Sequence, residues 1–470
     1  MHVALAFDWL QAHRWAALSL TLPIVLAVHL ISAAVTIRHS NQDPVASDQG
    51  AEMWLAATSR HDVFPQRTDG VRHPLWSWIA RSVYTEDQAV FFGRGKWLNT
   101  FLCVGFLSGL GLIVARWLDP LATANLLLLS SLGVLLVRGT YFQPEPLYYI
   151  LFFLATVVAW RILQGGPLWL YAAFGVLCGL AFLSKPSLLP FLIVFALAFC
   201  LRALLALNSG DTEWRAARNL AGMVLVAAIV AIMLLPLALF SEKYFGSPLF
   251  NYTKYWMWMD DFMTEAWPFQ DKYPGRVQLE QLPEEEKPSP RLYFQKHGID
   301  DALKRLSSGT WEVFSRFFFP EAKLQWSGLF RRSPEKKWEQ PLAHRGIYLI
   351  LLGALCAILA AVCGLTCGQF LRRPGNVAGL LFAAALGMIY LLLYGWYWPI
   401  GRGDRFMGSL WIPSVFALTW LAFEFRRRVE SPFGDTAYLA VHGVILISLA
   451  WQIVGILWRF GAGIYLVTRN

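Results

Sequence analysis

The chain has 470 residues, of which 56% are hydrophobic, 15% aromatic and only 15% charged. A soluble domain carries about a quarter charged residues, so this composition excludes an ordinary soluble protein and indicates a membrane protein. The net charge of +9 comes largely from short basic clusters between apolar runs. That distribution is typical of a membrane-topology determinant and argues against a nucleic-acid partner.

Apolar segments close to 20 residues long recur along the whole chain, and each is long enough to cross a hydrocarbon core of about 30 Å. The first is too long for the core of a signal peptide, so it is predicted to be a span. The sequence therefore predicts an all-α polytopic membrane protein with about eleven transmembrane helices. They cover residues 15–37, 97–117, 120–137, 146–163, 167–184, 187–206, 219–241, 345–369, 377–398, 406–424 and 437–458.

Basic turns between these segments predict the orientation. If the N-terminus with His13 and Arg14 lies inside, every basic cluster falls on the same face, as the positive-inside rule requires. Two long polar loops then lie on the outer face and divide the chain into three parts. These are an N-terminal transmembrane module at 1–241 with a first outer loop at about 38–96, a large outer loop at 242–344, and C-terminal transmembrane helices at 345–470.

Both outer loops carry signs of folding at the membrane surface. The first contains two short amphipathic patterns, at 51–58 and 73–84, the second with tryptophan at Trp76 and Trp78. Such patterns predict helices that lie in the interface. The second loop is about 100 residues long and rich in aromatic side chains, so it is predicted to fold back over the membrane surface.

Ionisable residues gather at the outer ends of the predicted spans. Because charged groups beside or within spans are costly, they usually serve a site. Lys185 in "GLAFLSKPSLL" has apolar neighbours on both sides, so it either marks a short interfacial turn or has an anionic partner or ligand. The other ionisable residues gathered there are Asp48, Glu52, Asp69, Arg72, His73, Arg138, Glu145, Arg402, Asp404 and Arg405.

Most of these residues also have a purely structural interpretation. Asp48 precedes a short helix and could cap it. Glu145 begins a span, where a carboxylate complements the helix dipole. His73 could be a buried structural histidine, and Arg402 and Arg405 could anchor a loop.

The chemistry that unites the candidates is phosphate recognition beside a carboxylate base. Arginine and lysine at a membrane boundary could hold the phosphate of a lipid carrier. A carboxylate could then deprotonate an acceptor hydroxyl for attack at the anomeric carbon of a sugar. Inverting transfer needs one base and a stabilised leaving group. The sequence contains no Walker motif, nucleophile elbow or HExxH, which argues against nucleotide-driven transport and the common hydrolases.

Four segments occur in a characteristic order: "DQGAEMW", "DGVRHPLWSWIARSV", "QPEPLYYILFFLA" and "GLAFLSKPSLLPFLIV". Together they resemble the GT-C superfamily of membrane glycosyltransferases, closest to the branch of protein O-mannosyltransferases and lipid A aminoarabinose transferases. That family takes sugar from polyprenyl or dolichyl phosphate. The resemblance implies that Asp48 is the catalytic acid of the first loop and Glu145 the second acidic position. His73-Pro74-Leu75-Trp76 matches a second motif with one proline missing, and Arg405 in "GDRFMGSLWIP" matches a late motif.

The sequence thus predicts an inverting glycosyltransferase with a polyprenyl-phosphate sugar donor and a glycan, lipid or protein acceptor. Asp48 is the expected base, and Glu145 orients it, shares a cation with it or contacts the acceptor. The expected phosphate ligands are Lys185, Arg405, Arg402, His73 and Arg72. Glu52, one helical turn after Asp48, is a weaker substrate-binding candidate and is expected to face water.

The expected location is a bacterial inner membrane with the site facing the periplasm or exterior. No cofactor is required, although Asp48 and Glu145 could together hold Mg²⁺ or Mn²⁺. Two carboxylates do not define a metal site, so the sequence leaves this question open. The six cysteines lie in apolar segments without zinc-type spacing, so neither a disulfide framework nor a thiolate metal site is expected.

Two other classes of protein fit part of the pattern. An O-antigen polymerase or ligase is also polytopic with outer arginines, but it acts on diphosphate-linked glycans, and Asp48 and Lys185 would then be incidental. A flippase or transporter would more often place ionisable groups near the membrane midplane on broken helices. Here they gather at one surface.

Overall fold

The fold is described from a computed structural model, which covers residues 14–39, 41–45, 48–209, 214–318, 345–364, 373–401, 405, 407–428 and 431–467. Every element in these ranges is a helix. Ten of the described helices are long and apolar enough to cross a membrane, which is the architecture of a multi-pass membrane protein. The fifth predicted span corresponds to α9, an apolar helix of only 17 residues.

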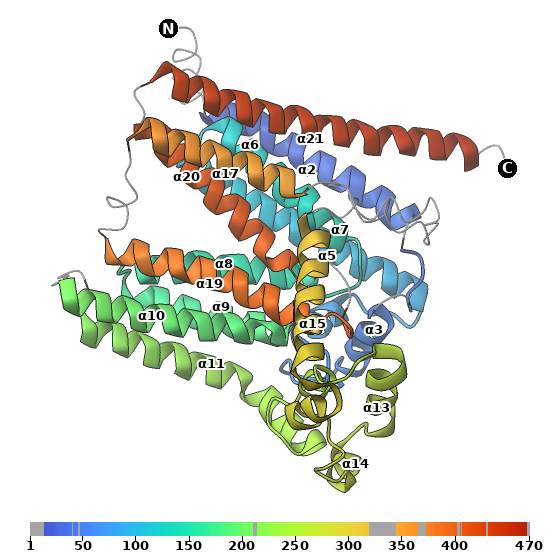
Figure 1. Ribbon diagram of the computed structural model, residues 1–470. Coiled ribbons are helices and arrows are strands. Elements are labelled where there is room, and N and C mark those ends of the chain that lie inside the picture. Colours follow the sequence, from blue (N-terminus) through green and yellow to red (C-terminus); the bar gives the residue numbers. More distant parts are fainter. Residues whose placement is uncertain are drawn as a thin grey trace.

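The long helices run side by side with their axes roughly parallel (Figure 1). The N-terminal set is α2 (Arg14–His39), α5 (Gln88–Val114), α6 (Pro120–Ser130), the π-helical turn η2 (Ser131–Leu135), α7 (Leu136–Gly139), α8 (Glu145–Leu163), α9 (Leu168–Ser184), η3 (Pro186–Leu188), α10 (Leu189–Ser209) and α11 (Ala216–Phe245). The C-terminal set is α17 (Arg345–Val362), α19 (Pro374–Trp396), η7 (Gly408–Leu410), α20 (Trp411–Arg428) and α21 (Pro432–Val467).

Several helix boundaries differ from the predicted ones, and two of them have a clear local cause. Helix α5 starts at Gln88, before the predicted residue 97, because the Asp87 side chain accepts hydrogen bonds from the first free amides of the helix. Helix α11 continues past residue 241 to Phe245. It ends at Gly246, whose φ of 73° suits the left-handed cap that glycine tolerates.

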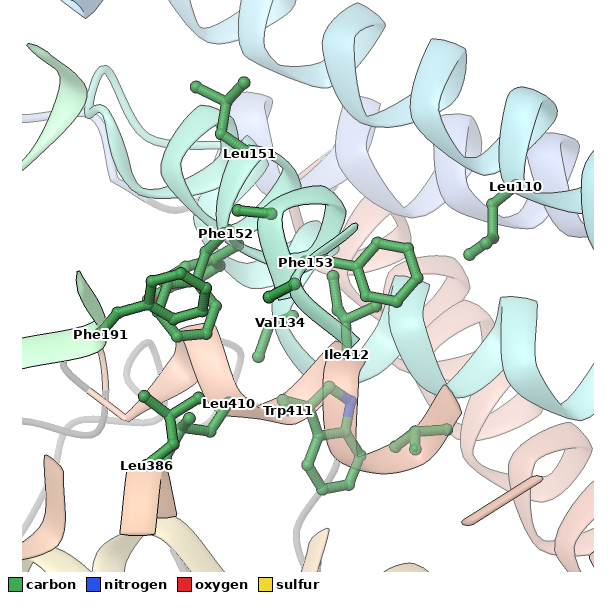
Figure 2. Close-up of a cluster of buried hydrophobic side chains, with 14 of the residues drawn as sticks. Leu110, Val134, Leu151, Phe152, Phe153, Phe191, Leu386, Leu410, Trp411 and Ile412 are labelled. Atoms are coloured by element: carbon green, nitrogen blue, oxygen red, sulfur yellow. The ribbon is translucent and has the colours of Figure 1, made fainter. Parts of the chain in front are cut away.

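Large apolar side chains fill the centre of the bundle (Figure 2). Phe152 and Phe153 of α8 belong to this core, and Trp411 at the start of α20 is completely buried within it. The Trp411 indole donates to the Leu129 carbonyl at 2.8 Å. Its Nε1 lies only 2.1 Å from where a Cβ on Gly133 would be, so this approach of α20 requires a glycine in the facing helix.

At one end of the bundle lie α3 (Gln49–Thr58), α4 (Pro74–Ala80) and the 3-10 turn η1 (Arg81–Val83). The sequence predicted helices in both places. Segment α15 (Pro290–Phe318), two helical stretches joined at a kink at Gly298, crosses that region transverse to the long helices (Figure 1). It packs against α19 where Gly309 meets Gly395, and a Cβ on Gly309 would lie 1.9 Å from the Gly395 oxygen.

The large loop also has a folded part. It contains α12 (Thr253–Trp256), η4 (Phe262–Ala266), α13 (Trp267–Lys272) and α14 (Arg276–Gln281). A cluster of buried side chains separate from the bundle core, which includes Phe250, Tyr252 and Trp256, packs these elements together. The Tyr252 amide donates to the Gly70 carbonyl at 2.7 Å, which fastens the large loop to the first loop.

Candidate functional site

A buried network of amide side chains fixes the backbone beside Asp48. Asn41 and Gln49 donate to each other through their side-chain amides at 2.9 and 2.8 Å. Gln49 Oε1 also accepts from the Phe142 amide at 2.9 Å, and Lys96 Nζ donates to the Asn41 carbonyl at 3.0 Å. Since α2, α3, α5 and the turn before α8 meet here, Asp48 is held against the bundle. The Asn41–Gln49 pair was not singled out in the sequence, although Gln49 directly follows the candidate base.

Asp48 occupies the cap position of α3, but its side chain does not cap the helix. Instead, Arg72 Nη2 donates to Asp48 Oδ1 and Arg405 Nη1 donates to Asp48 Oδ2, both at 2.8 Å. Burial alone would raise the pKa of Asp48, but the two guanidinium groups outweigh it and hold the pKa well below its usual range. The carboxylate is thus ionised, and at 38% exposure it remains reachable.

Arg72 joins Asp48 to a second carboxylate. Its Nη1 donates to Asp69, whose other oxygen accepts from the Val71 and Arg72 amides at 2.9 and 2.8 Å. Burial would lower the pKa of Arg72, but Asp69 and Asp48 raise it. Asp69 is one of the ionisable residues that the sequence places at the outer face, but it was not assigned a role in the site. The sequence does carry a signal for it, since Asp69-Gly70 forms a turn three residues before the arginine.

Glu145 and Lys185 form the other side of the site. Lys185 Nζ donates to Glu145 Oε1 at 2.8 Å, and Arg405 Nη1 lies 3.9 Å from the same oxygen. Glu145 begins α8 and is 2% exposed, whereas Lys185 lies at the break between α9 and η3. The break occurs there because Pro186 disfavours helical geometry at the preceding residue. The anionic partner of Lys185 is therefore Glu145.

Arg405 stands between the two candidate acids. It is bonded to Asp48 and lies near Glu145, and its carbonyl accepts a hydrogen bond from the Tyr149 hydroxyl. Burial would lower the pKa of Arg405, but the two carboxylates raise it. Of the three relations expected between Asp48 and Glu145, the geometry is that of a shared cation. Arg402 lies outside the described residues.

The expectation that Glu52 faces water is wrong. Helix α4 covers it, leaving only 1% of the residue exposed, and Ser77 Oγ donates to Glu52 Oε2 at 2.6 Å. Burial raises the pKa of Glu52 to about 8, against the opposing effect of Arg72, so the carboxyl is largely protonated at neutral pH. Glu52 therefore joins α3 to α4 behind the arginine.

His73 is buried as well and serves as a link between helices. Its Nδ1 donates to the Phe182 carbonyl of α9 at 2.5 Å, and the two rings lie 5.0 Å apart. Burial lowers the pKa of His73 to about 4, so the ring is neutral at pH 7. A neutral, buried imidazole holds α4 against α9 but does not supply a positive charge for a phosphate.

The residues present do not fit a divalent cation bridging Asp48 and Glu145. The Arg405 guanidinium lies between the two carboxylates and already supplies the positive charge that they share. Within the described residues, no group of three or more His, Cys, Asp or Glu side chains is arranged to hold a metal ion. The five described cysteines are free thiols, and Cys367 lies outside the described residues.

In comparisons with known proteins, no family model matches the chain and no curated relative was found. The function is therefore argued from the geometry of the site. Its main components are one ionised, accessible carboxylate and three cationic side chains from segments far apart in the sequence: Arg72, Lys185 and Arg405.

Proposed function

We propose that the protein is an inverting membrane glycosyltransferase of the GT-C type that takes sugar from a polyprenyl-phosphate donor. The observation that carries this proposal is the Asp48 carboxylate, which is held by Arg72 and Arg405 and is partly open to solvent. An ionised carboxylate beside several cations suits a reaction that both removes a proton and releases a phosphate.

The resting site contains a weak base, because the two arginines stabilise the ionised form of Asp48. A donor phosphate offers the same guanidinium groups a competing anion that can accept two hydrogen bonds at once. When the phosphate engages Arg72 and Arg405, it reduces their hold on Asp48, and the basicity of the carboxylate rises. Binding of the donor thus activates the base.

Transfer then requires one bond to form and one to break. Asp48 removes the proton of the acceptor hydroxyl. At the same time, the oxygen of that hydroxyl attacks the anomeric carbon from the face opposite the phosphate. The bond between that carbon and the phosphate oxygen breaks, and the configuration inverts. Arg72, Arg405 and Lys185 stabilise the negative charge that develops on the departing phosphate. Glu145 keeps Lys185 and Arg405 in place.

The proposal includes a placement in the membrane. We take α9 as an eleventh span beside the ten longer helices, with the site at the outer, periplasmic or lumenal, surface of a bacterial inner membrane or its equivalent. Helices α3 and α4 and the large loop then lie at that surface. The tryptophan side chains of the two loops support this placement, since Trp prefers the interface.

The direct test is Asp48→Asn in proteoliposomes that contain a polyprenyl-phosphate-linked sugar, with release of polyprenyl phosphate as the readout. We expect the rate to fall by about 10²–10⁴, the usual contribution of a general base. The matched control is Asp43→Asn, an exposed carboxylate in the same loop. The donor is identified beforehand by mass spectrometry of lipid-linked sugars in cells with and without the protein.

Three outcomes would overturn the proposal. One is full activity of correctly folded Asp48→Asn. Another is movement of the lipid across the bilayer with no release of polyprenyl phosphate, which would indicate a flippase. The third is turnover only of diphosphate-linked glycans, which would indicate a polymerase or ligase.

A further inference from the structure

A pocket of about 460 Å³ lies beside the candidate site, and the mechanism above does not use it. It is bounded by α3, the turn at 67–69, the C-terminal end of α11 and the segment around α13. This volume lies within the usual range of ligand pockets, about 300–1,000 Å³. The pocket is thus large enough for a small ligand.

Exposed aromatic rings line this pocket together with polar side chains. Trp54 of α3 is 58% exposed and Trp267 of α13 is 51% exposed, and both line the pocket. Asp271, Gln270 and Arg67 also line it. Large exposed apolar groups that converge on one hollow indicate a binding surface.

This combination matches the chemistry of a saccharide. The faces of sugar rings present C–H groups, which pack well on the faces of indole rings, while carboxylate and amide groups bind the hydroxyls at the ring edges. Most of the lining is apolar, and Arg67 already forms an ion pair with Asp62 at 2.7 Å. An isoprenoid tail would use the apolar lining but has no need of Asp271 or Gln270, and these two polar side chains favour a sugar.

The pocket is connected to the candidate base by two consecutive ion pairs. Asp69 lines the pocket and forms the ion pair with Arg72, which in turn binds Asp48. Trp54 lies six residues after Asp48 along α3, a distance of about 9 Å along the helix axis. A ligand in the pocket would therefore lie against Asp69, which is linked through Arg72 to the carboxylate that is proposed to activate the acceptor.

We propose that this pocket binds a saccharide acceptor, so that the acceptor is a glycan in preference to a protein or a simple lipid. The role of the bound saccharide as acceptor rests on the proposed function. Saccharide binding itself does not depend on it. Trp54 and Trp267 supply the ring contacts, and Asp271 and Gln270 bind hydroxyl groups.

The test uses the whole 470-residue chain in lipid nanodiscs. Labelled nanodiscs are applied to an array of immobilised glycans, and the dissociation constant of a retained glycan is then measured by titration calorimetry. Trp54→Ala and Trp267→Ala are each expected to weaken binding by about fivefold to tenfold, the worth of one aromatic contact. Trp311→Ala is the matched control, because Trp311 of α15 is 62% exposed and does not line the pocket. Farnesyl phosphate is titrated in parallel.

The result that supports the proposal is saturable glycan binding that both pocket variants weaken and the control does not. The proposal is overturned if the array retains no protein, or if glycan binding is equal in all three variants. It is also overturned if the pocket variants lose farnesyl phosphate and not glycan, which would assign the pocket to the lipid carrier. The two proposals are separated by their readouts, since Asp48→Asn is expected to slow transfer by about 10²–10⁴ whereas Trp54→Ala and Trp267→Ala are expected to weaken glycan binding.

Discussion

Replacing Lys185 by Met should destabilise the protein, because it removes the closest counter-charge of a buried carboxylate. Glu145 is 2% exposed, and its Oε1 lies 2.8 Å from Lys185 Nζ and 3.9 Å from Arg405 Nη1. At an effective dielectric constant of about 20, these two contacts are worth about 6 and about 4 kcal/mol before the cost of desolvation. Arg405 therefore compensates for part of the loss and not for all of it.

Breaking a buried ion pair from one side costs about 3–5 kcal/mol, and we expect the lower limit here because Arg405 stays in place. The double variant Lys185→Met/Glu145→Gln leaves no unpaired charge in this pair and should stay within about 1 kcal/mol of the original protein. Glu145→Gln alone removes the ion pair between Lys185 and Glu145, and its stability should fall between those of the other two variants. Lys304→Met, at an exposed position of α15, is the control.

The assay is the midpoint of thermal unfolding in detergent, measured at one heating rate for all variants, because membrane proteins commonly unfold irreversibly. For a chain of this size, a loss of about 3 kcal/mol corresponds to a fall of roughly 3–6 °C. The four proteins form a double-mutant cycle. The Lys185–Glu145 pair does not stabilise the protein if Lys185→Met has the same unfolding midpoint as the original protein. The same follows if the midpoint of the double variant falls by as much as the two single variants combined.

Three further predictions concern neighbouring positions. Between about pH 4.5 and 8 the folded state holds a proton on Glu52 that the unfolded state has lost, so stability should fall as pH rises through this window. Glu52→Gln should flatten the dependence of the melting midpoint on pH. An unchanged slope would show that burial does not raise the pKa of Glu52. Gly309→Ala should cost about 1–3 kcal/mol in thermal stability, because the new Cβ would strike the backbone of Gly395, whereas Gly387→Ala, which faces open space, should have little effect. Arg72→Lys should lower kcat/KM by roughly 10- to 100-fold, since lysine lacks the fork that joins two carboxylates; equal activity would show that charge alone suffices.

The helical membrane architecture could be predicted from the sequence because each span carries its own apolar signal. Helix ends were harder to predict, since single local interactions decide them. Asp87 starts α5 early and Gly246 stops α11 late. The helix α9 is too short for the length criterion, so its assignment as a span depends on its neighbours.

For the candidate site, topology placed the ionisable residues on one face but could not pair them. Asp48 and Arg405 are 357 positions apart, and no spacing rule joins them. Glu52 shows the limit most clearly. Its spacing from Asp48 is helical, but the helix that covers it, α4, is packed there by tertiary contacts that no local pattern encodes. The same is true of the Gln49 side chain, which the sequence shows only as a polar residue.

The network around Asp48 also has a charge balance. Among the residues that the structure describes, four cations face three salt-bridged carboxylates, while Glu52 is largely protonated at neutral pH. The cations are Arg72, Arg138, Lys185 and Arg405, and the carboxylates are Asp48, Asp69 and Glu145. Under the proposed function, this surplus of one positive charge equals the single negative charge of a sugar phosphodiester. The released phosphate monoester carries about −1.5 to −2 at neutral pH, so the same cations attract the lipid product more strongly than the donor, and product release has to overcome that attraction.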